Sequence, residues 1–378
     1  MREILKACLP VLLAAVAGGA GMVFADDDHS TRLFIDRDVD AFAVLREGVR
    51  FPEGITANPR NGDIFVGTFD APSMANPSPK NKLLRFDRRG RLEAERDFGS
   101  TPLLGLEFDR NTRKVYIAAV GDFSGTGSRI LRIAANFNGA TAIEEVALIP
   151  SVGPPTPRTV VNPDTSLDTI MFGAFARVPN AMVLNRHGNV LYISDSFQGA
   201  IFRISNLPGC APNCNVEKIS HDPLLATAGF PPFGANGLAL SRDEKTLFIA
   251  NTGDDRVLKF DLTLPPLSMN AVSVFAESIN GADGLAIDKH GRVWVAANQA
   301  DEVLALNEHG RIVARLGEFR GIRRNGTPNG LLFPASLVIV DDEMFVTNLA
   351  LPLNNITGDE PEEDVSRWTV SRLKLPRH

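Results

Sequence analysis

Six short phrases of the sequence share one pattern, in which a variable residue is followed by a small residue and then by an apolar one. They are Glu53-Gly-Ile, Leu104-Gly-Leu, Asn180-Ala-Met, Asn236-Gly-Leu, Asp283-Gly-Leu and Ala335-Ser-Leu. Four of the six variable residues carry side-chain oxygens, and these are Glu53, Asn180, Asn236 and Asp283. If the phrases are equivalent strands around one axis, these four side chains converge at one end of it.

A ring of carboxylate and amide oxygens without His or Cys is the ligand set that a hard cation prefers, and Ca²⁺ tolerates irregular geometry. Glu53 and Asp283 supply two negative charges, which balance one divalent ion, while Asn180 and Asn236 add neutral oxygens. Because Ca²⁺ takes about six to eight ligands, four side chains leave places for water and substrate. The residues therefore predict one divalent metal ion, with Ca²⁺ the best fit and Mg²⁺ also compatible with the ligand types.

A different interpretation of the same four residues needs no metal. The two carboxylates can stand in water at the start of a strand, and the two asparagines can make local hydrogen bonds in turns. Their shared place in the repeat favours the metal site.

The elements that must position these side chains are short strands. In the fourth copy we expect strands at 237–241, 246–251, 256–262 and 271–276, with a turn at 242–245. Four strands per copy make one propeller blade, and the spacing of the copies is near the usual blade period apart from one longer interval. The sequence therefore predicts an all-β fold, a six-bladed β-propeller with four-stranded antiparallel blades.

The last copy supplies only three strands, at 337–340, 343–348 and 367–375. We expect the fourth strand to come from 41–49 near the N-terminus, which closes the ring and removes the open sheet edges. The alternatives are a propeller with a different number of blades and a β-sandwich with accidental spacing.

Three longer phrases extend the pattern: Phe51-Pro-Glu-Gly-Ile-Thr, Gly234-Ala-Asn-Gly-Leu-Ala-Leu-Ser241 and Gly281-Ala-Asp-Gly-Leu-Ala-Ile-Asp288-Lys-His-Gly-Arg-Val-Trp-Val-Ala296. They resemble the senescence marker protein, gluconolactonase and luciferin-regenerating enzyme family, which is related to paraoxonase and diisopropylfluorophosphatase. The resemblance implies a calcium-dependent six-bladed hydrolase whose metal is held by Glu, Asn, Asn and Asp. By motif these positions fall on Glu53, Asn180, Asn236 and Asp283.

On this chemistry the metal polarises the carbonyl group of a lactone or ester, and water attacks it. Asp283 is the expected general base. The metal can also acidify the attacking water, and the sequence does not apportion the two effects.

Five longer connections are expected around the same end of the axis, at 71–80, 121–128, 153–178, 221–234 and 350–363. Two of them carry the apolar residues Met171, Phe172, Phe175, Phe230 and Phe233, which suggests an apolar lip that binds substrate, chiefly through Phe172, Phe175 and Phe233. The alternative is that these side chains only pack the loops onto the ring. His221 is expected to reach the same face as a substrate-binding residue, and the alternatives are a role in proton transfer and a plain surface position.

The N-terminus has the features of a secretory signal peptide at residues 1–25. Arg2 and Lys6 precede an apolar stretch, and Val23-Phe24-Ala25 resembles a cleavage site; an uncleaved anchor is the alternative. We expect residues 26–39 to be flexible and residues 40–378 to form the propeller. No later segment is apolar for long enough to span a membrane. The mature protein is expected to be periplasmic or secreted, and monomeric.

The remaining cysteines and the charge fit that picture. Cys210 and Cys214 are expected to form a small disulfide loop; two free thiols or half of a zinc site are the alternatives. A formal net charge of −6, from 39 basic and 45 acidic residues, argues against nucleic-acid binding.

Three classes of function are compatible with these features. The first is a metal-dependent hydrolase of lactones or esters. The second is a non-catalytic propeller that binds a partner or ligand at its rim. The third is a metal-independent relative that resembles strictosidine synthase.

Overall fold

A computed structural model describes residues 33–71, 78–121, 127–353 and 359–376, and the predicted signal peptide lies outside these ranges. The described chain is built almost entirely of β-strands. Short 3-10 helices occur at Pro223–Leu225, Asn298–Ala300 and Pro361–Asp364.

Six antiparallel four-stranded sheets form the blades. Blades one to three are β3 (Pro52–Asn58), β4 (Asp63–Thr68), β5 (Asn81–Phe86) and β6 (Leu92–Gly99); β7 (Leu103–Asp109), β8 (Lys114–Ala119), β9 (Arg129–Ala134) and β10 (Glu144–Leu148); and β13 (Pro179–Leu184), β14 (Val190–Asp195), β15 (Ala200–Ser205) and β16 (Val216–His221). Blades four to six are β17 (Ala235–Leu240), β18 (Thr246–Asn251), β19 (Arg256–Asp261) and β20 (Val272–Glu277); β21 (Ala282–Ile287), β22 (Val293–Ala297), β23 (Glu302–Leu306) and β24 (Ile312–Leu316); and β27 (Pro334–Val340), β28 (Glu343–Asn348), β29 (Thr369–Lys374) and β2 (Asp40–Val44).

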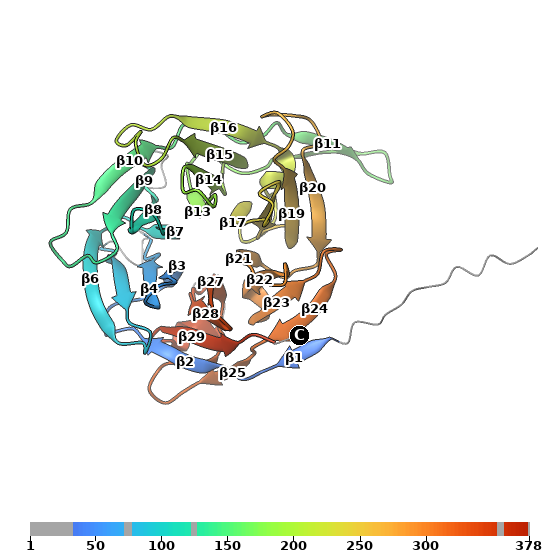
Figure 1. The fold of residues 1–378 in the computed structure, drawn as a ribbon. Coiled ribbons are helices and arrows are strands. Elements are labelled where there is room, and N and C mark those ends of the chain that lie inside the picture. Colours follow the sequence, from blue (N-terminus) through green and yellow to red (C-terminus); the bar gives the residue numbers. More distant parts are fainter. Residues whose placement is uncertain (1–32, 72–77, 122–126, 354–358, 377–378) are drawn as a thin grey trace, which may run out of the picture. The chain divides into compact units, whose positions relative to one another are not determined.

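The inner strand of each blade contacts the inner strand of the next blade. The order is β3, β7, β13, β17, β21, β27 and back to β3, which closes a ring around a central axis (Figure 1). The predicted six-bladed propeller is therefore confirmed.

Closure follows the predicted route. β2, from the N-terminal part of the chain, pairs antiparallel with β29 and completes the last blade. Within the segment 26–39, which was expected to be flexible, the structure instead shows the strand β1 (Phe34–Asp36), paired in parallel with β24 as a fifth strand of blade five. The hydrogen bonds of the open β24 edge order this tripeptide, and nothing in its own sequence indicates a strand.

The core consists of apolar layers between neighbouring blades. Second strands such as β8 and β22 are buried on both faces, and their sequences are accordingly continuous apolar runs rather than alternating ones. One layer packs Phe42 and Phe345 of blade six against Ile64 and Phe86 of blade one. Because each blade is held on two sides, the inner strands have little freedom to move.

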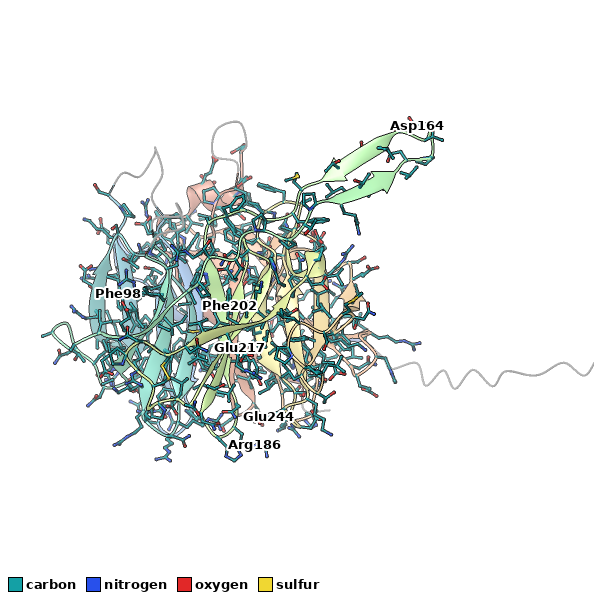
Figure 2. All side chains as sticks on the ribbon, turned by 90° about the horizontal axis from the view of Figure 1, so that it is seen from above. Phe98, Asp164, Arg186, Phe202, Glu217 and Glu244 are labelled. Carbon is teal, nitrogen blue, oxygen red and sulfur yellow. A yellow bond between two sulfur atoms is a disulfide. The ribbon has the colours of Figure 1, made fainter. Side chains whose placement is uncertain are left out.

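One insertion leaves the ring. Strands β11 (Arg158–Val161) and β12 (Leu167–Ile170) form a separate hairpin that projects from one end of the propeller, with Asp164 near its tip (Figure 2). The turns that carry Arg186 and Glu244 lie at the opposite end (Figure 2). Among the described residues, no helix is long and apolar enough to cross a membrane.

Candidate functional site

The structure brings the four predicted oxygen-bearing residues together at the axis. Glu53, Asn180, Asn236 and Asp283 lie in the inner strands of blades one, three, four and five, and each is at most 5% exposed. All four line one cavity of about 40 Å³, which has room for an ion or a water molecule.

The small residue after each of these positions explains the convergence. A Cβ atom on Gly237 would lie 2.2 Å from the backbone oxygen of Asp283, and one on Gly284 would lie 2.6 Å from Cα of Ser336. Because glycine has no Cβ, the inner strands can approach closely. A β-bulge between Ala235 and Leu238 also disrupts the ladder at this point, and bulges of this kind commonly redirect side chains.

A second layer of polar side chains orients three of the four residues. Nδ2 of Asn180 donates to Oγ of Ser196 (3.0 Å), and Ser196 donates in turn to the backbone oxygen of Ala235 in the next blade (2.7 Å). Because its nitrogen is committed to Ser196, the amide oxygen of Asn180 is left for another partner.

Blades four and five repeat this arrangement. Nδ2 of Asn236 donates to Oγ1 of Thr252 (2.9 Å), which donates to the backbone oxygen of Ala282 (2.7 Å). Nδ2 of Asn298 donates to Oδ2 of Asp283 (2.9 Å). Ser196, Thr252 and Asn298 each follow the second strand of their blade, so the repeat places the supporting groups as well as the ring.

The two carboxylates of the ring are buried. Among the described residues, Oε2 of Glu53 and Oδ1 of Asp283 have no hydrogen-bond partner. Burial raises the pKa of Glu53 well above its usual value, and the negative charge of Asp283 raises it further. Burial raises the pKa of Asp283 to about 7, against the hydrogen bond from Asn298 and the nearby amide of Asn236, which lower it.

This arrangement fits a hard divalent cation. Two unpaired carboxylate oxygens and two amides offer oxygen ligands only, and one divalent ion would neutralise the pair. In the part of the chain that the structure covers, no group of three or more His, Cys, Asp or Glu side chains gathers around a possible metal position. A site rich in imidazole or thiolate, as transition metals prefer, is therefore not present among those residues.

The other half of the cavity is apolar. Leu104 is the ring residue of blade two, and Phe69 and Leu349 occupy the positions that Thr252 has in blade four. Further apolar lining residues come from the loops above the ring: Pro231, Phe233, Phe333, Leu351 and Leu353. This set of apolar residues, with Phe69, Leu104 and Leu349, is called the apolar wall below.

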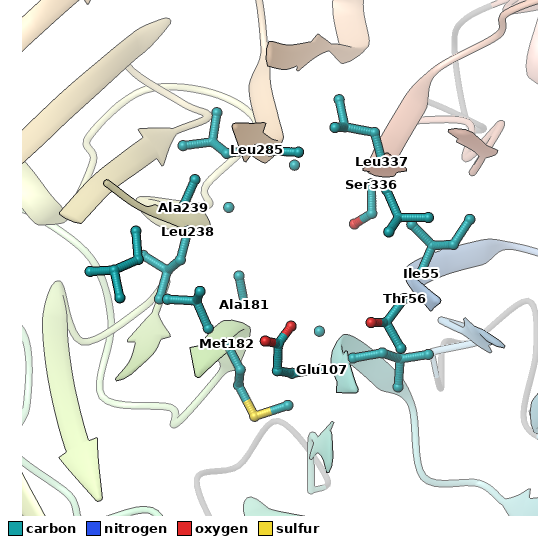
Figure 3. A pocket seen from close by; sticks show the side chains of 18 of the residues that line it. Ile55, Thr56, Glu107, Ala181, Met182, Leu238, Ala239, Leu285, Ser336 and Leu337 are labelled. Carbon is teal, nitrogen blue, oxygen red and sulfur yellow. The ribbon is translucent and has the colours of Figure 1, made fainter. Parts of the chain in front are cut away.

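The central tunnel continues on the other side of the ring. It has a volume of about 370 Å³, and Asn180 and Asn236 line both it and the smaller cavity. Thr56, Glu107 and Ser336 point into the tunnel (Figure 3). Burial raises the pKa of Glu107 to about 7, although the backbone N–H of Leu184 donates to Oε1 (3.1 Å).

Of the predicted substrate-binding residues, only Phe233 lines the cavity at the ring. It packs against Phe197 and Phe69, with ring centroids 5.3 and 6.4 Å apart. Phe233 therefore lines the cavity and also packs a loop onto the ring. In the prediction from the sequence, these two roles, substrate binding and loop packing, were alternatives.

The structure places Phe172, Phe175 and His221 away from the ring. Phe172 is buried beside Arg158, and Phe175 is 77% exposed. Both lie in the insertion that forms the projecting hairpin, which the sequence pattern did not reveal. His221 ends β16, the outermost strand of its blade, and its Nε2 lies 3.1 Å from the backbone oxygen of Gly153.

The structure agrees with one further prediction, because Cys210 and Cys214 form a disulfide.

Ser196, Thr252, Asn298 and most of the apolar wall were not identified from the sequence. The small polar cluster at the end of each second strand was a usable signal for the first three residues. The wall residues Leu351 and Leu353 lie in a loop without a repeat, so no pattern marks them.

Part of the chain is similar in sequence to known proteins. Residues 229–317, which include Asn236 and Asp283, match the family described as SMP-30/Gluconolactonase/LRE-like region. A curated relative, lactonase drp35 of Staphylococcus saprophyticus, is 31% identical over 87 residues. That alignment covers 22% of this chain and 26% of the relative, so the match spans about a quarter of its length.

Solved structures share the fold over most of the chain. Regucalcin from Agrobacterium tumefaciens, a calcium-binding protein, has a TM-score of 0.57 at 15% identity and covers 91% of this chain and 95% of its own. The luciferin-regenerating enzyme has a TM-score of 0.54 at 12% identity and covers 87% and 92%. The chain is thus a six-bladed propeller with an SMP-30/gluconolactonase/LRE-like region at residues 229–317, which confirms the family resemblance inferred from its motifs.

Proposed function

We propose that the chain is a metal-dependent hydrolase of lactones or related esters, and that Ca²⁺ is its metal. The observation that carries this proposal is the pair Glu53 and Asp283, two buried carboxylates with unpaired oxygens on the wall of one cavity. A stable fold rarely leaves such a pair without a compensating charge. The lactonase relative and the calcium-binding neighbour support the same reaction class and metal.

Each ring residue has a part in this function. Glu53, Asn180, Asn236 and Asp283 would hold the ion, and Ser196, Thr252 and Asn298 fix the orientation of the last three. When bound, the ion supplies stabilisation of the negative charge that develops on the carbonyl oxygen.

The protein's contribution to the reaction comes from Asp283 and from the dry cavity. We propose Asp283 as the general base that accepts a proton from the attacking water. The water oxygen bonds to the carbonyl carbon, the bond between that carbon and the ring or ester oxygen breaks, and the proton passes to the leaving oxygen. One lactone and one water then give one hydroxy acid. The apolar wall limits the water near the reacting group, which strengthens electrostatic interactions there.

Metal analysis and a hydrolysis panel test this proposal. We expect the purified protein to contain about one divalent ion per chain, and hydrolysis of lactones or aryl esters to stop with chelator and return with Ca²⁺. Glu53→Gln and Asp283→Asn should each lose metal and activity. Glu107→Gln is the matched control, because it also removes a buried carboxylate at the axis but does not touch the ring cavity.

The same experiment separates the other classes. Activity that persists in chelator would replace this proposal with a metal-independent reaction. Absence of both metal binding and hydrolysis would leave the propeller as a scaffold for a partner at its rim.

We also propose that the mature chain works in the periplasm or outside the cell. The disulfide between Cys210 and Cys214 suits an oxidising compartment. Fractionation and N-terminal sequencing should find the mature chain outside the cytoplasm, beginning at Asp26. A cytoplasmic, full-length chain would contradict this.

A further inference from the structure

We propose that the substrate of this site carries an apolar alkyl or aryl body, and that polyhydroxylated sugar lactones are poor substrates. This inference rests on the proposed hydrolase function and assigns its substrate class. It follows from the chemistry of the apolar wall and from the hydrogen bonds around the ring.

The cavity is divided into two halves. Blades three to five contribute Asn180, Asn236 and Asp283 with their supporting polar groups. Blades six, one and two contribute Leu349, Phe69 and Leu104, all at most 6% exposed, and among the described lining residues from these blades only Glu53 is polar. A carbonyl group directed at the ring oxygens therefore leaves the rest of the substrate against apolar side chains.

Most polar groups of the first half are already engaged. The hydroxyl of Thr252 accepts from Asn236 and donates to the backbone oxygen of Ala282, and Ser196 is committed in the same way. The amide nitrogen of Asn298 donates to Asp283, whereas its side-chain oxygen has no partner among the described residues. One substrate hydroxyl can therefore donate to Asn298, but a polyhydroxylated sugar buries several hydroxyls, and burying those left without a partner is unfavourable.

The charges of the residues that line the cavity also favour a neutral, apolar substrate. Among the described residues around this cavity there is no Lys, Arg or His, and the only charges are the carboxylates of Glu53 and Asp283. Apart from the proposed ion, a phosphorylated or carboxylated substrate would find no cationic side chain among the described lining residues. A neutral apolar substrate needs none.

The entrance is apolar as well. Of the lining residues that the structure describes, Phe233, Leu351 and Leu353 are only half-buried, whereas the others are buried. A substrate that enters the cavity would therefore contact these three side chains. They would pack against its apolar part, as Phe233 already packs against Phe69.

Two δ-lactones with the same ring test the inference: δ-nonalactone, which has an alkyl chain, and glucono-δ-lactone. With Ca²⁺ present and uncatalysed hydrolysis subtracted, we expect kcat/KM to favour the alkyl lactone by about 100-fold or more, the discrimination that an apolar pocket gives against an added hydroxyl. Equal rates, or a preference for the sugar lactone, would overturn the inference and leave the hydrolase function standing. Hydrolysis of neither lactone, nor of an aryl ester, would count against the hydrolase function itself.

Substitutions in the apolar wall test whether these residues cause the preference for the alkyl lactone over the sugar lactone. Leu353→Asn, at the half-buried entrance, should reduce the ratio of the two kcat/KM values by at least about 10-fold. Leu349→Asn, next to the ring, should do the same if thermal melting shows that it folds. Leu148→Asn is the matched control, because Leu148 is 56% exposed on β10 and does not line the cavity. An unchanged ratio in both folded wall variants would contradict the assignment of the wall.

Discussion

Asn298 holds one oxygen of Asp283 and leaves the other without a partner. Its Nδ2 donates to Oδ2 of Asp283 over 2.9 Å, while Oδ1 of Asp283 is buried and has no partner in the part of the chain that the structure describes. The amide thereby fixes which carboxylate oxygen is available to a ligand. This is the role that groups behind metal ligands have in other proteins.

Asn298→Ala should weaken calcium binding by about 10- to 100-fold, because Asp283 would lose the hydrogen bond that orients it. Calorimetric titration of the metal-free protein with Ca²⁺ measures this directly. Gln299→Ala is the control, since Gln299 is exposed and follows Asn298 in the sequence. An unchanged affinity in Asn298→Ala would mean that another group orients Asp283.

The stability of the metal-free protein should fall as the pH rises. Burial, together with the charge of Asp283, raises the pKa of Glu53, and burial raises that of Asp283 to about 7. The folded protein therefore binds these protons more tightly than the unfolded chain. The resulting stability is present below about pH 4, the ordinary range of these groups, and is lost as the pH rises through about 7.

Thermal melting from pH 5 to pH 8 checks this. In chelator we expect Tm to decline across that range, and Ca²⁺ to restore it most strongly at pH 8, because the cation replaces the lost protons. Glu53→Gln should flatten the decline and lose the calcium effect. Glu107→Gln should keep the calcium effect, because Glu107 lies outside the ring cavity. A calcium effect that is independent of pH would argue against coupling between the pair and the ion.

The four ring residues could be predicted because each occupies the same position in its blade. Glu53 and Asp283 lie near the start of the inner strands of their blades, and equivalent positions of the inner strands meet at the axis. The hydrogen bond between Asn298 and Asp283 is harder to predict from the sequence. Asn298 lies fifteen residues after Asp283, and the two meet only because the second strand of the blade returns antiparallel beside the first.

The misplaced residues have a different origin. The sequence predicts Phe172 and Phe175 in an apolar lip around the end of the axis because their connection is long, but that connection forms its own hairpin, β11 and β12, which projects from the propeller. The length of a connection does not determine its direction. His221 was assigned in a similar way, although it still belongs to the outermost strand of its blade.

Asp288 should make a large contribution to the stability of blade five. Its Oδ2 accepts from Nε1 of the fully buried Trp294 (2.9 Å) and from Nε of Arg292 (2.6 Å). Asp288→Ala would leave the indole N–H buried without a partner, at a cost of about 1–3 kcal/mol. Urea denaturation followed by tryptophan fluorescence measures this.

Asp243→Ala is the comparison for Asp288→Ala. Asp243 accepts hydrogen bonds from Ser241 and Lys245 in an exposed hairpin turn, so its loss should cost clearly less. Equal destabilisation by the two variants would show that the turn, and not the buried indole, determines the effect of Asp288.

Gly237→Ala should damage both the fold and the ring. A Cβ at this position would lie 2.2 Å from the backbone oxygen of Asp283, and 2.8 Å from Cα of Gly284, so the strands β17 and β21 must separate. Overpacking against backbone costs about 1–3 kcal/mol or more. Because the displaced backbone carries Asn236 and Asp283, calcium affinity should fall together with Tm.

Blade three provides the control for Gly237→Ala, because Ala181 occupies the equivalent position there. Ala181→Gly should not crowd the neighbouring strand, and its cost should be limited to about 0.5–1 kcal/mol of added backbone entropy. If Gly237→Ala melts at the wild-type temperature and binds Ca²⁺ with unchanged affinity, then the close approach of β17 and β21 is not what brings Asn236 to Asp283.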